Sequence, residues 1–159
     1  MPSERHMRLV VLGAKYFKKQ GFPLVATELW AHASRERVDV AAFRSTCSAM
    51  IEVKVSREDF YADRKKPERR RELTGFGNYR FYLCPKDLLT KNDLPSGWGL
   101  LYVDGNVITE VLKPKGNSWP NIEHASKEWS DFCHESDEKA ERALLFSIAR
   151  RLSRGEKVV

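Results

Sequence analysis

The stretch that decides the fold reads Arg37-Val38-Asp39-Val40-Ala41-Ala42-Phe43, and Met50-Ile51-Glu52-Val53-Lys54-Val55 follows it. Both runs are rich in aliphatic residues, and the residues between them are mostly polar. The pattern therefore predicts a β-hairpin over 37–43 and 49–55. Asp39, Glu52 and Lys54 interrupt these apolar strands. Ionised groups on core strands are costly unless they are paired or bind a metal, so these residues need an explanation.

Strand periodicity predicts which of these side chains share a face. Alternate residues of a strand point to the same side of a sheet. We therefore expect Asp39 to face away from its neighbours Val38 and Val40, and Glu52 and Lys54 to share one face of the partner strand. The polar side chains can then gather while the aliphatic ones pack inward. An ion pair between Lys54 and either carboxylate is the simplest alternative to a functional site.

The rest of the chain predicts further helices and strands around this hairpin. Helices are expected over 3–20, 56–66, 68–73 and 136–153, and strands over 24–30, 79–84, 99–103 and 107–112. Ser56 has the character of a helix cap, and Pro67 separates the second helix from the third. This order predicts an α/β fold in one domain spanning 1–159, with a mixed sheet, a central hairpin and helices on its faces.

Composition restricts the class of protein further. The net charge is +6 and the sequence pI is about 9.3, which suits a polyanionic partner. Positive residues concentrate in Arg64-Lys65-Lys66-Pro67-Glu68-Arg69-Arg70-Arg71. The three cysteines are too few and too widely spaced for a disulfide framework. We expect no membrane span, no signal peptide and a cytoplasmic, nucleoid-associated location. A homodimer is possible, but no interface is legible in the sequence.

A longer run, Glu52-Val53-Lys54-Val55-Ser56-Arg57-Glu58-Asp59-Phe60-Tyr61-Ala62-Asp63-Arg64-Lys65, resembles the MmcB family of bacterial DNA-repair proteins. That family shows an E-V-K-x-S-x-x-D-F-x-x-D-x-K run. Asp39, followed by Glu52-Val53-Lys54 and a helix, also resembles the PD-(D/E)xK nuclease superfamily. The resemblance covers roughly 24–154. It departs at Val38, where the superfamily name has proline, and after Lys65, where the family usually has Trp-Pro-Glu-Tyr.

The resemblance implies a restriction-endonuclease-like core and a metal-dependent DNA endonuclease acting in repair, recombination or phage DNA processing. Asp39 and Glu52 would bind Mg²⁺ or Mn²⁺ with the Val53 carbonyl, and Lys54 would position the attacking water or meet the developing negative charge. Glu28 is expected to complete the catalytic set, with Glu4 as its rival. The expected nucleic-acid contacts are Arg57, Arg64, Lys65, Lys66, Arg69, Arg70 and Arg71.

Two other functions remain open. A DNA-binding module that keeps the nuclease fold without catalysis would explain the basic residues equally well. An RNA-directed nuclease would use the same chemistry.

Asp59 and Asp63, four residues apart on one helical face, could orient Lys54 or a neighbouring basic residue. The four histidines form no recognisable site in the sequence.

Overall fold

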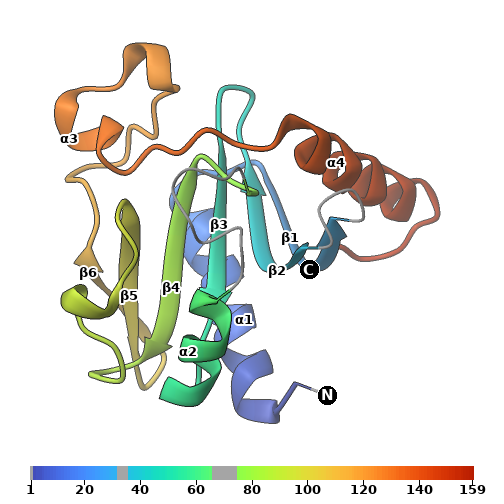
Figure 1. Cartoon of the computed structure of the whole chain (residues 1–159). Helices are drawn as coiled ribbons and strands as arrows, with labels where there is room; N and C mark the ends of the chain where they lie inside the picture. The colour runs from blue at the N-terminus through green and yellow to red at the C-terminus, as the bar shows by residue number, and fades with distance from the viewer. Residues whose placement is uncertain (1, 32–35, 66–74) are drawn as a thin grey trace.

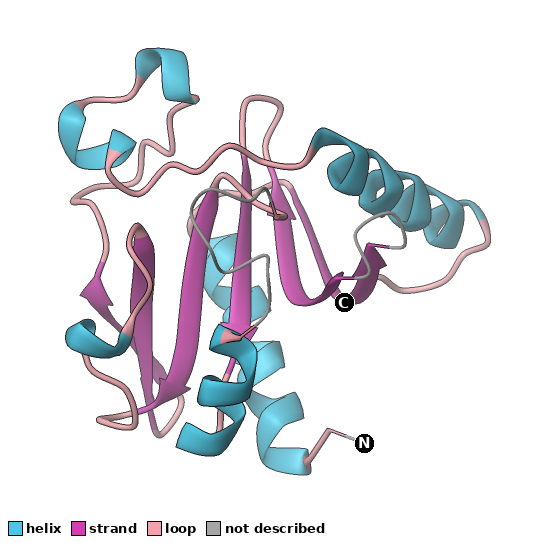
Figure 2. Cartoon of the chain, in the orientation of Figure 1, coloured by secondary structure: helices cyan, strands magenta, loops and turns pink. Residues whose placement is uncertain are grey.

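The computed structural model describes residues 2–31, 36–65 and 75–159, and it contains the elements shown in Figures 1 and 2. The helices are α1 (Glu4–Lys19), α2 (Arg57–Arg64), α3 (Lys127–Ser130) and α4 (Glu138–Ser153), with 3₁₀ turns at Lys91–Asp93 and Ile122–His124. The strands are β1 (Leu24–Ala31), β2 (Glu36–Phe43), β3 (Ser48–Val53), β4 (Tyr79–Pro85), β5 (Trp98–Asp104) and β6 (Val107–Leu112). The short helix predicted over 68–73 falls outside the described residues.

The strands form one six-stranded mixed sheet in the order β1-β2-β3-β4-β5-β6. Strands β3, β4 and β5 run parallel, whereas β1, β2 and β6 are antiparallel to their neighbours. The predicted hairpin β2–β3 is confirmed, and the predicted strands at 99–103 and 107–112 pair as a second hairpin, β5–β6. The predicted α/β class and mixed sheet are confirmed as well.

Helix caps follow from short polar side chains at the predicted places. The Ser3 hydroxyl accepts a hydrogen bond from the His6 amide at 3.1 Å and begins α1. The Ser56 hydroxyl accepts one from the Asp59 amide at 3.2 Å and begins α2, as the sequence predicts. Because Ser56 follows β3 so closely, α2 starts directly beside the end of that strand.

Helices cover both faces of the sheet. In Figure 1, α1 lies behind the sheet, and α2 and α4 lie in front of it. The hydrophobic cluster on the α1 face includes Leu9, Val10, Ala14, Phe17, Val40, Ile51, Val53 and Phe81. The cluster on the opposite face includes Val38, Met50, Phe60, Tyr82, Ala140, Leu144 and Ile148. Tyr79, Phe81 and Trp98 are buried in these clusters and serve packing.

The predicted alternation holds along β3 but is wrong along β2. On β3, Ile51 and Val53 face α1, and Met50 lies on the other side. On β2, Val38 belongs to the α2–α4 side although Val40 faces α1. The cause lies in the neighbouring strand, where Glu28 has a positive φ of 55° and is left out of the β1–β2 pairing. This irregularity shifts the alternation of both strands opposite Asp39.

Candidate active site

The β2–β3 hairpin opens at the end of the sheet where its ionisable residues lie. Pairing of the two strands ends at Val40 and Ile51. Beyond that point the Asp39 side chain takes the place of a backbone hydrogen-bond acceptor, because its Oδ2 accepts a 2.9 Å hydrogen bond from the Val53 amide. Asp39 is therefore fixed against β3, next to the residues that follow Val53.

Lys54 lies in this opening between two buried carboxylates. Its Nζ is 3.9 Å from Oε2 of Glu52 and 3.4 Å from Oδ1 of Asp63 on α2. The other oxygen of Asp63 accepts a 2.5 Å hydrogen bond from the Tyr82 hydroxyl on β4. A charge cluster this deeply buried is stable only when each member is paired, and the geometry supplies those pairs. The contact between Asp63 and Lys54 agrees with the expectation from their spacing.

Asp39 remains ionised despite its burial. Burial by itself raises the pKa of the Asp39 carboxyl, but hydrogen bonds from His6 and from the Val53 amide, together with attraction to Lys54, outweigh it. The net result is a pKa below the ordinary value for aspartate. A carboxylate in this state is negative at neutral pH and suited to bind a cation.

Glu28 lies in the middle of β1, although we expected it at the end of that strand. It forms an ion pair with Arg37 across the strand pair, and one of its ligand atoms lies within 4.8 Å of those of Asp39 and His6. Its rival Glu4 is exposed in the first turn of α1 and is not part of this group. The structure therefore brings Glu28, and not Glu4, close to Asp39, and a catalytic role for Glu28 stays a prediction.

His6 is a residue that the sequence analysis missed. Its Nε2 lies 3.4 Å from Oδ2 of Asp39. The available signal was its helical position, since Val10 and Gly13 follow at spacings of four and three and both are buried. A histidine on the buried stripe of α1 had to face the sheet.

A hollow of about 260 Å³ lies beside Lys54 and His6, and we call it the Lys54 pocket. It is lined by His6, Val53, Lys54, Asp59, Ala62 and Asp63. A larger hollow of about 600 Å³ lies at the β2–β3 turn and the start of α4. Its lining includes Glu135, Glu138 and Glu141 and contains none of the residues predicted to act in catalysis. The smaller hollow is therefore the better candidate site.

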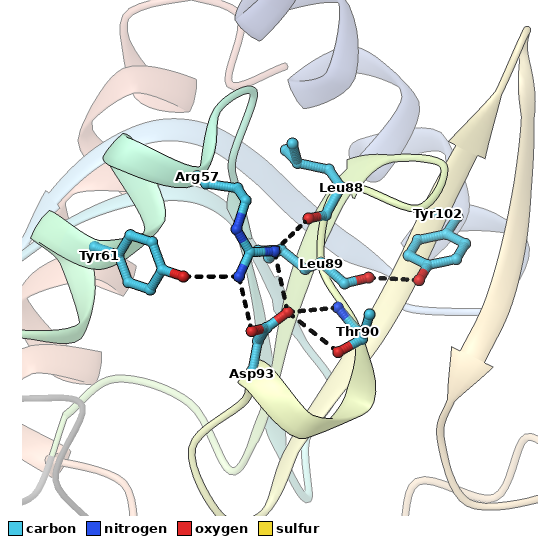
Figure 3. Close-up of polar contacts among 7 residues, drawn as sticks. All are labelled: Arg57, Tyr61, Leu88, Leu89, Thr90, Asp93 and Tyr102. Atoms are coloured by element: carbon cyan, nitrogen blue, oxygen red, sulfur yellow. Dashed lines mark hydrogen bonds and ion pairs between the residues drawn. The ribbon is translucent and has the colours of Figure 1, made fainter.

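The predicted basic contacts fall into distinct groups. Arg57 packs against the β4–β5 connection, where its guanidinium donates to both oxygens of Asp93, the Leu88 carbonyl and the Tyr61 hydroxyl (Figure 3). These contacts tie α2 to that connection, and a phosphate contact by Arg57 stays a prediction. Arg64 and Lys65 are exposed at the end of α2. The others, Lys66, Arg69, Arg70 and Arg71, lie outside the described residues.

Comparisons with known proteins bear on the fold. A scan against protein-family models found no match, and a search of curated proteins found none. Among solved structures, the chain is similar to the SPO1766 protein of unknown function from Silicibacter pomeroyi, with 20% sequence identity and a TM-score of 0.64. The match covers 97% of this chain and 90% of that one, and at this identity it shows a shared fold alone. Within the described part of the chain, none of the helices has the length and apolar character to cross a membrane.

Proposed function

We propose that this protein is a metal-dependent nuclease that hydrolyses phosphodiester bonds in DNA, on a core of the restriction-endonuclease type. The observation that carries the proposal is the position of Lys54 at the Lys54 pocket, with Nζ 3.9 Å from Oε2 of Glu52. The Asp39 carboxylate is fixed beside it by the Val53 amide. A carboxylate pair that can hold a metal ion beside a cationic side chain is an arrangement that can catalyse phosphodiester hydrolysis.

The carboxylates fit a hard divalent cation. Asp39 and Glu52 are 7% and 3% exposed, and buried anionic oxygens of this kind are stabilised by a bound metal. Together with the Val53 carbonyl they would hold Mg²⁺ or Mn²⁺. When bound, such an ion lowers the pKa of a coordinated water and stabilises charge on the phosphate.

The residues of the chain would divide the remaining work. The Lys54 ammonium would orient the water whose oxygen attacks phosphorus, and would offset negative charge as the P–O bond to the leaving group breaks. Asp63 and Tyr82 would hold Lys54 in that position. Asp39 and Glu52 alone would repel a phosphodiester, so Lys54 and the exposed Arg64 and Lys65 supply attraction.

The test is cleavage of a substrate panel of single-stranded, duplex, nicked and branched DNA, and of RNA, with Mg²⁺ or Mn²⁺. We expect the wild type to cut at least one DNA substrate, and Glu52→Gln and Lys54→Met to lose activity. Lys86→Met is the matched control, because Lys86 pairs with Asp104 at 3.8 Å on the exposed surface. The proposal fails if no substrate is cut, or if Lys54→Met cuts as well as Lys86→Met.

A second candidate is a DNA-binding module without catalysis. It is favoured by the pairing of Lys54 with both Glu52 and Asp63, because a buried ion-pair cluster can serve structure alone. In the same panel, metal-independent binding of DNA without cleavage would support this alternative.

A further inference from the structure

A histidine and two carboxylates from three elements converge beside the Lys54 pocket. They are His6 of α1, Glu28 of β1 and Asp39 of β2, and one potential ligand atom of each lies within 4.8 Å of the other two. Asp39 is buried, and His6 and Glu28 are partly buried. The folded arrangement of α1 against the sheet, rather than sequence proximity, assembles this group.

Two atoms of the group are enclosed by protein but have no hydrogen-bond partner among the described residues. They are Nδ1 of His6 and Oε1 of Glu28. Native proteins rarely leave such atoms unsatisfied, and for Oε1 of Glu28 a bound ion is one of the ordinary explanations. Arg37 pairs with the other oxygen of Glu28, so Oε1 is the oxygen left for a ligand.

The spacing between His6 and Asp39 suits a shared cation. Nε2 of His6 is 3.4 Å from Oδ2 of Asp39. Adjacent ligands of an octahedral ion with bonds near 2.1 Å lie about 3 Å apart, so a small side-chain rotation brings both atoms into coordination distance. An ion pair between a protonated His6 and Asp39 would give the same separation, and the experiment must distinguish the two.

The backbone at Glu28 is unusual in the same place. Its φ of 55° lies in the left-handed region, which is costly for a residue with a β-carbon. Residues on either side of Glu28 pair normally with β2, whereas Glu28 and Asp39 do not pair. The irregularity therefore coincides with the two carboxylates of the group.

We propose that His6 and Glu28 join Asp39 in binding the metal ion of this protein, and that the centre selects a first-row transition-metal ion such as Mn²⁺ over Mg²⁺. This inference rests on the proposed function, because it assigns ligands to the metal of that site. Mg²⁺ takes oxygen ligands and keeps its water shell, whereas transition-metal ions accept imidazole nitrogen. A centre with one imidazole nitrogen among its carboxylate ligands should therefore discriminate against Mg²⁺.

The test uses the full chain without nucleic acid and Mn²⁺ as the probe. Pulsed electron paramagnetic resonance detects coupling between Mn²⁺ and a directly bound nitrogen. We expect this coupling in the wild type, its loss in His6→Gln and its retention in His124→Gln, since His124 is exposed on a 3₁₀ turn. Bound Mn²⁺ without nitrogen coupling, or coupling that persists in His6→Gln, would overturn the assignment of His6.

Calorimetric titration supplies a second readout, and its first comparison uses the wild-type protein alone. Wild-type protein should bind Mn²⁺ at least about tenfold more tightly than Mg²⁺, and equal affinities would overturn the selectivity. Glu28→Gln should weaken Mn²⁺ binding roughly tenfold or more. Glu4→Gln on the exposed first turn of α1 is its control and should bind as the wild type does.

The two proposals can fail separately. Nitrogen coupling with no cleavage of any substrate would overturn the nuclease and leave the ligand assignment intact. Cleavage supported equally by Mg²⁺ and Mn²⁺, with no nitrogen coupling, would do the opposite.

Discussion

The carboxylate of Asp63 holds the ammonium group of Lys54 from helix α2. Its Oδ1 lies 3.4 Å from Lys54 Nζ, and its Oδ2 accepts a hydrogen bond from the Tyr82 hydroxyl at 2.5 Å. The Asp63 and Lys54 side chains are 1% and 10% exposed, so water competes little for either charge. Because an unpaired buried charge is strongly unfavourable, each of the two side chains restricts the other to one position.

Asp63→Asn should therefore slow catalysis, because Asp63 acts by positioning Lys54 rather than by binding the substrate. An amide keeps the shape but not the charge, so Lys54 loses the anion that positions it. In the cleavage assay we expect kcat to fall about 10–100-fold with KM little changed. Glu58→Gln, at an exposed position in the first turn of α2 outside the lining of the Lys54 pocket, should cut nearly as the wild type does. Equal kcat values for the two variants would show that Asp63 does not position Lys54.

The contact between Arg57 and Asp93 predicts a pH-dependent contribution to stability. The hydrogen bond from Arg57, followed by that from the Thr90 amide, holds the pKa of Asp93 below its ordinary value (Figure 3). Such a carboxyl stabilises the fold above its unfolded pKa of about 3.9, and the contribution disappears as pH falls through the folded pKa. Asp93→Asn should lower the thermal midpoint by roughly 1–4 °C at pH 7.

That difference between Asp93→Asn and wild type should shrink below about pH 4, as the wild-type carboxyl becomes protonated. Thermal unfolding followed by circular dichroism across this range measures it. Asp104→Asn is the control, because the Asp104 side chain is 67% exposed and its pair with Lys86 should contribute little. A difference that stays constant from pH 7 to pH 3 would contradict an ionic origin.

The sequence predicts β3 and its helix well because their signals are local. The alternation of Met50 and Ile51 on opposite faces follows from regular strand geometry, and Ser56 carries its own capping chemistry. The contact between Asp63 and Lys54 was foreseeable as well, since α2 begins directly after β3. Local pattern and tertiary structure agree at these positions.

The rest of the candidate site depends on contacts between distant segments. The predicted orientation of Val38 was wrong because the positive φ of Glu28, on the neighbouring strand, shifts the alternation of side chains on both strands. His6 reaches Asp39 only when α1 packs on the sheet. Arg57 is predicted to contact nucleic acid, but its partner Asp93 comes from the β4–β5 connection. His6 and Asp39, like Arg57 and Asp93, are too far apart in the chain for a local pattern to join them.

Gly99 on β5 should tolerate no side chain. A methyl group on it would overlap the ring of Phe81 on the neighbouring strand and lie 2.8 Å from the Leu112 carbonyl oxygen. Gly99→Ala should therefore cost about 1–3 kcal/mol in the free energy of unfolding, measured by urea denaturation. Because Phe81→Leu removes the ring, Gly99→Ala should cost less in that background than in the wild type. Equal costs in both backgrounds would mean that the ring is not the obstacle.

Arg64 and Lys65 should contribute electrostatic affinity for DNA rather than sequence selection. Both are exposed at the end of α2, the helix that supplies Asp59, Ala62 and Asp63 to the Lys54 pocket. Each phosphate contact releases condensed counterions. The magnitude of the slope of log affinity against log salt concentration therefore decreases by about 1 for each contact removed. We expect Arg64→Ala/Lys65→Ala to weaken binding of unrelated duplex sequences equally and to reduce that slope by about 2. Fluorescence anisotropy at several salt concentrations, without divalent metal, measures both quantities.

Lys115→Ala/Lys127→Ala removes the same charge from exposed positions in and beside α3, which Figure 1 places away from α2. An equal loss of slope in both double variants would mean that net charge, and not this helix end, attracts the DNA.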